Sequence, residues 1–85
     1  MGFWETVLQC GEGYERGRAI GVATRLLSKK GTDAIVDIGQ VVCTSSSDHL
    51  DRVEGVLMHS CDHAWTAGAR RHAAEILETF RRMRG

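Results

Sequence analysis

The chain has no proline, so none of its 85 residues carries the ring that interrupts helices. Aromatic residues are scarce, with two tryptophans, one tyrosine and two phenylalanines. The three cysteines are an odd number and none has the CxxC spacing, which argues against the disulfide framework of a small secreted domain. We therefore expect a reducing, cytoplasmic setting.

The chain also lacks a charge excess and a long apolar run. Its 11 basic and 11 acidic residues give a formal charge of zero, so no overall basic field favours nucleic acid. No apolar run approaches the ~20 residues of a membrane span. The first ten residues include Glu5 and no basic residue, unlike a signal peptide. We expect no binding to a membrane.

Arginines gather near the C-terminal end, in RRMRG and in the earlier pair Arg70 and Arg71. Such a patch could hold phosphate or an acidic partner. Glu75 and Glu78 offset part of its charge, and cations are favoured at the end of a helix. Nucleic-acid binding is therefore only a minor alternative.

Apolar residues recur at helical spacing along most of the chain. Residues 34–43 are rich in β-branched side chains and could form a strand, but their periodicity favours a helix. Thr32 and Asp33 are candidate N-caps, and the polar run TSSS at 44–47 is a break that offers further caps. We predict an all-α bundle of four to five short helices in a single domain, residues 1–85. The expected helices are one before Gly11 and Gly13, then about 14–29, 32–43, 48–66 and 69–84, with Gly68 separating the last two.

A stripe of small residues runs through the second expected helix, since Gly13, Gly17 and Gly21 recur every four residues. Each glycine costs a helix interior ~1 kcal/mol relative to alanine. The stripe therefore predicts close approach of another helix, either from the same chain or from another copy. A frayed, glycine-rich helix start is the alternative. The predicted helix-contact residues are the three glycines, with Phe3, Trp4 and Trp65 as apolar anchors.

The motif HSCDH places His59 and His63 four residues apart, on one face of a helix. Two imidazoles at this spacing can chelate zinc or copper. Their face is polar, whereas Cys61 is expected to point toward the core, as is Cys43. A solvated polar face is the main interpretation, without a cofactor. The alternative is a surface metal site at His59 and His63, completed by a symmetry mate or by His49 or His72.

No catalytic constellation is evident in the sequence. GEGYERG has the spacing GxGxxxG rather than GxGxxG and follows a helical segment, so it does not predict dinucleotide binding. No paired carboxylates lie in an apolar setting, and the serines of TSSS have no histidine placed locally as a base. We predict that the chain is not an enzyme.

GYERGRAIGVATRLLSKKG, with SSSDHLDRVEGVL after it, resembles the helical C-terminal tails of Rpn-type, transposase-like nucleases of the PD-(D/E)XK class. The resemblance covers about residues 11–58 and does not include the catalytic acidic motif and lysine of these nucleases. It implies a helical, self-associating appendage rather than a nuclease.

A domain of this length buries only ~60–65% of its unfolded surface and is often marginally stable alone. Together these features predict an interaction or oligomerisation module. Its expected partners are itself, as a homodimer or larger, and a second protein that it could regulate by binding.

Overall fold

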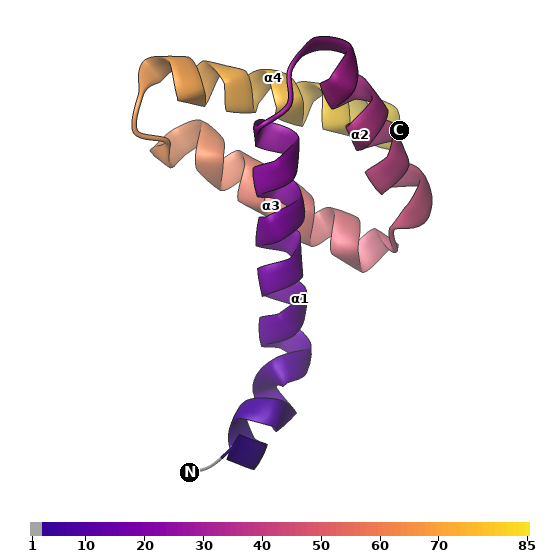
Figure 1. The fold of residues 1–85 in the computed structure, drawn as a ribbon, viewed down its shortest axis with the longest axis vertical. Coiled ribbons are helices and arrows are strands. Elements are labelled where there is room, and N and C mark those ends of the chain that lie inside the picture. Colours follow the sequence, from indigo (N-terminus) through magenta and orange to yellow (C-terminus); the bar gives the residue numbers. More distant parts are fainter. Residues whose placement is uncertain (1–2) are drawn as a thin grey trace.

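The computed structural model describes residues 3–85, with side chains described from residue 14 onward. This part of the chain forms helices α1 (Phe3–Leu27), α2 (Gly31–Thr44), α3 (Ser47–His63) and α4 (Ala67–Arg84), and it contains no strand (Figure 1). The predicted all-α bundle is confirmed. The helical interpretation of residues 34–43 is confirmed as well, so periodicity outweighed β-branching there.

Helix α1 is a single element, so the predicted break at Gly11 and Gly13 is wrong. Each glycine costs a helix only about 1 kcal/mol, and without proline nothing blocks the hydrogen-bond ladder. The C-terminal half of α1 crosses α3, while its N-terminal half extends away from the other three helices (Figure 1). The described chain therefore has a compact part, in which the four helices pack together, and a projecting part, the N-terminal half of α1. The compact part is called the head below.

Helix α2 begins at a turn that glycine makes possible. Gly31 has φ +59°, a left-handed conformation that side-chain-bearing residues seldom adopt. The N-cap is Lys30, which makes no side-chain capping bond, so the prediction of Thr32 or Asp33 as the cap is wrong. Asp33 instead lies in the first turn, where a carboxylate favours the helix dipole.

Side-chain caps set the starts of α3 and α4. Ser46 accepts a hydrogen bond from the backbone N–H of His49 at 3.2 Å, as the TSSS run predicted. Thr66 caps α4 by accepting from the N–H of Ala69 at 3.0 Å. Consequently α3 ends at His63 rather than at Thr66, and Gly68 lies inside α4 rather than between helices.

We expect Ser46→Ala to lower the free energy of unfolding by ~1 kcal/mol, because an N–H at the start of α3 loses its acceptor. Ser47→Ala is the matched control, since no hydrogen bond of the Ser47 hydroxyl is found among the described residues. Urea denaturation of both variants checks the prediction. Equal midpoints would contradict it.

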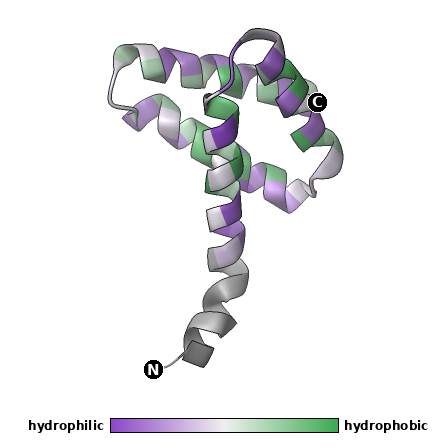
Figure 2. Ribbon diagram, in the orientation of Figure 1, coloured by the Kyte–Doolittle hydropathy of each residue, from purple (hydrophilic) through white to green (hydrophobic). Residues whose placement is uncertain are grey.

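The core gathers where the four helices meet, and green segments mark these contacts in Figure 2. Phe80 of α4 is its largest fully buried side chain. Each helix contributes one buried face. The buried apolar residues are Ala19, Ala23, Leu26, Ala34, Ile38, Val41, Leu50, Val53, Leu57, Ala73, Ile76, Leu77 and Phe80.

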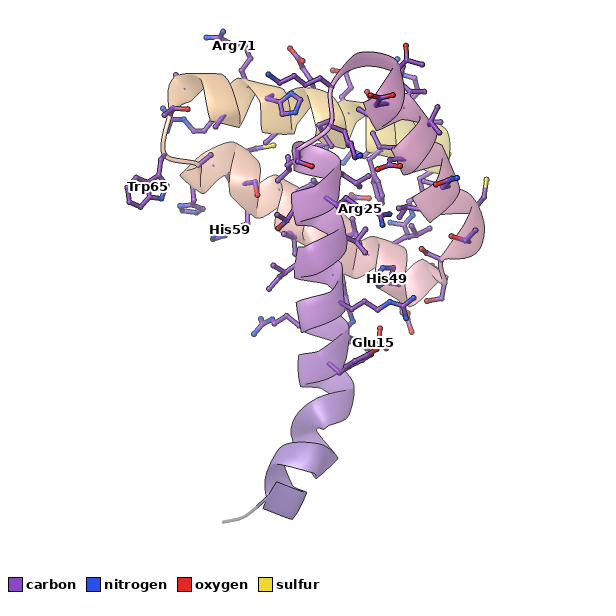
Figure 3. All side chains as sticks on the ribbon, in the orientation of Figure 1. Glu15, Arg25, His49, His59, Trp65 and Arg71 are labelled. Atoms are coloured by element: carbon purple, nitrogen blue, oxygen red, sulfur yellow. The ribbon has the colours of Figure 1, made fainter. Side chains whose placement is uncertain are left out.

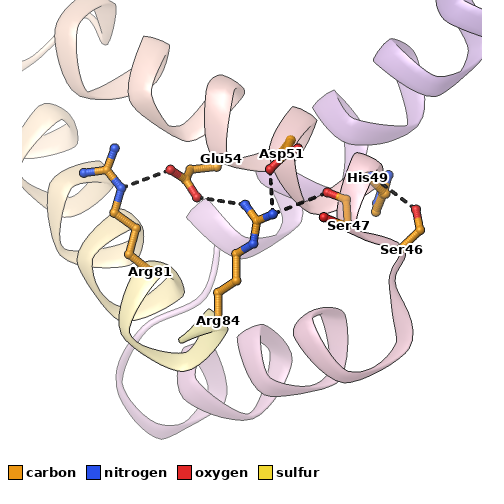
Figure 4. Close-up of polar contacts among 7 residues, drawn as sticks. All are labelled: Ser46, Ser47, His49, Asp51, Glu54, Arg81 and Arg84. Carbon is orange, nitrogen blue, oxygen red and sulfur yellow. Dashed lines mark hydrogen bonds and ion pairs between the residues drawn. The ribbon is translucent and has the colours of Figure 1, made fainter.

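An ion-pair network joins the end of α4 to the start of α3 (Figure 4). Arg84 donates to Asp51 at 2.6 Å and to Glu54 at 3.1 Å, and Arg81 donates to Glu54 at 3.2 Å. The hydrogen bond to Asp51 is the largest influence that raises the pKa of Arg84. The negative charge of Asp51 and the hydrogen bond and charge of Glu54 raise it further. Cations thus occupy the last turn of α4, as the arginine cluster predicted.

Candidate interaction surface

The glycine stripe of α1 lies in the open. Gly17 and Gly21 are exposed, and a Cβ built on either would meet no atom within 4 Å apart from the neighbouring backbone of α1 itself. Close packing of this stripe within the chain, one of the two predicted forms, is therefore wrong. Packing against another copy remains a prediction. Gly13, Phe3 and Trp4 fall outside the residues whose side chains are described.

Alanines, not glycines, bring α1 close to its neighbours. Ala19 and Ala23 are 1% and 0% exposed and lie one turn apart on the face toward the core. A methyl group gives close approach without the cost of glycine to the helix. The intrachain contact of α1 is therefore made by the side of the helix opposite the stripe, since Ala19 lies two residues, or about 200°, from both Gly17 and Gly21.

A groove of about 420 Å³ lies between α1 and α3. Its apolar lining includes Ala19, Val56 and Ile20, and the last of these is 47% exposed. Gly55 opens the α3 side, because a Cβ there would meet nothing within 4 Å. The remaining lining residues are Arg16, Arg52 and His59. An apolar side chain could therefore enter between two helices.

The polar lining of the groove is cationic or basic. Neither Arg16 nor Arg52 forms an ion pair with any residue whose side chain is described. The carboxylates of Asp51 and Glu54 are engaged instead by arginines of α4. A ligand with carboxylates flanking apolar groups would complement this lining.

The two predicted metal ligands do lie together at the end of α3. The rings of His59 and His63 stack with centroids 4.3 Å apart, and both residues are exposed. His49 is buried and His72 lies 3.0 Å from the carbonyl oxygen of Leu27, so neither completes a site. Among the residues with described side chains, no group of three potential ligands is found.

Three other predictions have different outcomes. Trp65 is 98% exposed and projects from the turn between α3 and α4, so it does not anchor the core (Figure 3). Its role as an anchor in an interface stays a prediction. Cys61 packs against the core as predicted. Cys43 is exposed near the end of α2, so its predicted burial is wrong.

The two cysteines should differ in reactivity. Burial raises the pKa of the Cys61 thiol, and the Asp62 carboxylate raises it further. The thiolate is the nucleophile, so in a Cys10→Ser background iodoacetamide should alkylate Cys43 several-fold faster than Cys61 near neutral pH. The difference should narrow as the pH rises and Cys61 ionises. Peptide mass spectrometry measures both rates, and faster reaction of Cys61 would contradict the prediction.

His49 is a buried residue whose burial was not predicted from the sequence. It is only 5% exposed, and its Nδ1 has no hydrogen-bond partner among the described residues. The sequence placed it only at a helix start. His49 lies four residues before the fully buried Val53 and so shares its face of α3, a spacing that could have indicated its burial.

Fold and surface together define a class, a four-helix domain with an apolar, arginine-lined groove. Comparison with known proteins finds no matching family model, no matching curated protein and no matching solved structure. Within the described part of the chain, no helix has the length and apolarity to cross a membrane.

Proposed function

We propose that this chain is a helical interaction module that self-associates through the face of α1 beside the α1–α3 groove. The observation that carries the proposal is the groove itself, with an apolar lining and half-exposed Ile20 next to Gly17 and Gly21. A second helix could lie there without displacing any side chain of the stripe. We also propose that the same surface binds a second protein and regulates it.

Filling the groove provides the test. Gly55→Leu places a branched side chain in the groove. The substitution should not weaken α3, because leucine stabilises a helix by about 1 kcal/mol relative to glycine. We expect wild-type protein to show the mass of a dimer or larger assembly by light scattering after size exclusion, and Gly55→Leu to be monomeric. Gly68→Leu is the matched control, since Gly68 is equally open and lies in α4 outside the groove. A wild-type monomer at all accessible concentrations would contradict the proposal.

Metal binding at His59 and His63 is the second candidate, favoured by their stacked, exposed rings. Two imidazoles alone leave zinc with only half of the four ligands typical of a structural site. Elemental analysis of tag-free protein tests the idea. Stoichiometric zinc or copper that is lost in His63→Ala would support it, and its absence would contradict it.

A further inference from the structure

We infer that the groove between α1 and α3 binds the N-terminal segment of α1, residues 3–12, from a second copy of this chain. The inference rests on the proposed function and names the occupant of the same surface. Three observations support it, namely the chemistry of the groove, the composition of the segment and the continuity of α1.

The lining of the groove favours an occupant that carries both apolar and acidic side chains. Arg16 and Arg52 line it without a carboxylate partner among the described side chains, and His59 lies on the same lining. Between these groups the surface is formed by Ala19, Ile20 and Val56. A twofold contact of one groove on another would bring like charges together, which is unfavourable.

Residues 3–12, FWETVLQCGE, have this chemistry. Their only charged residues are Glu5 and Glu12, and their large apolar residues recur at i, i+1, i+4 and i+5. In a helix this spacing forms one apolar face. The apolar residues are Phe3, Trp4, Val7 and Leu8.

The segment cannot reach the groove of its own chain. Helix α1 runs unbroken from Phe3 to Leu27, and Ile20 lies 17 positions beyond Phe3. At 1.5 Å per residue these positions are ~25 Å apart along one axis, and a continuous helix cannot fold back on itself. The occupant must therefore come from another copy.

Two copies can exchange their segments about a twofold axis, which fills both grooves by one symmetric contact. If the two α1 helices run antiparallel and cross near residue 12, positions 3 and 7 of one copy fall opposite positions 21 and 17 of the other. Trp4 and Leu8 of one copy then fall at the level of Ile20 and Arg16, which line the groove of the other copy.

Charge reversal tests the inference on the full-length chain. One variant reverses the groove, with Arg16→Glu and Arg52→Glu, and the other reverses the segment, with Glu5→Lys and Glu12→Lys. We expect each alone to associate about tenfold more weakly or not at all, because like charges meet in both contacts. Mixed in equal amounts they should re-form a dimer, since both contacts become complementary again. Circular dichroism confirms that each variant is folded.

The outcomes separate the two proposals. If wild-type protein self-associates but the reversed segment leaves its mass unchanged, or the mixture stays monomeric, this inference is wrong while the interaction module stands. If wild-type protein is monomeric throughout, both are wrong. In a Trp65→Phe background Trp4 is the only indole, so its emission should shift to the blue with concentration. The same shift should be absent when Gly55→Leu is added.

Discussion

Phe80→Ala should lower the free energy of unfolding by about 3–5 kcal/mol, enough to leave much of the protein unfolded at 25 °C. Phe80 is the largest fully buried side chain and lies where α4 meets the other helices. Its removal takes away the transfer free energy of the ring and leaves a cavity. A domain of this size has little reserve, because small domains bury a smaller share of their surface.

Trp65→Ala is the control for Phe80→Ala, because it removes an aromatic ring that is 98% exposed. Its free energy of unfolding should stay within about 0.5 kcal/mol of wild type. Urea denaturation at one low protein concentration compares the two variants while keeping association out of the measurement. Similar losses for both would contradict the core described for α4.

Ala23→Leu should destabilise the domain by ~1–3 kcal/mol, the cost of forcing a larger side chain into a close-packed contact. Ala23 is 0% exposed and lies where α1 crosses the head. The added carbons have no room unless α1 shifts away from the helices that cover this face.

Thr24→Leu is the neighbouring control for Ala23→Leu. Thr24 is exposed, and leucine has the higher helix propensity. We expect this variant to match wild type or to exceed it slightly. Thermal unfolding followed by circular dichroism compares the stability of the two variants. A smaller loss of stability for Ala23→Leu than for Thr24→Leu would show that α1 does not pack on the head through its alanines.

Helical periodicity predicted most of the fold, because one apolar face per helix is a local property of the sequence. It placed five residues of α2 on one apolar face, namely Ala34, Ile35, Ile38, Val41 and Val42. Ala34, Ile38 and Val41 are buried as predicted, whereas Ile35 is 51% exposed. Boundaries were less accurate. Gly11 and Gly13 indicated a break that α1 does not have, and Thr66 was assigned to α3 although its side chain caps α4.

The surface was harder to predict because it is formed between elements distant in sequence. Arg16 and Ile20 meet Arg52 and Gly55 only because α1 crosses α3, and no spacing within either helix reports that crossing. The small-residue pattern predicted a contact surface on α1. It selected the glycine face, whereas the buried contact within the chain is made by Ala19 and Ala23.

Isotope-filtered NMR of a mixture of labelled and unlabelled protein tests most directly which segment occupies the groove. The exchange of N-terminal segments predicts intermolecular cross-peaks from the ring protons of Phe3 and Trp4 to the methyl groups of Ile20 and Val56. Cross-peaks between copies that involve only Ile35 and Val36, which are half-exposed on α2, would contradict it.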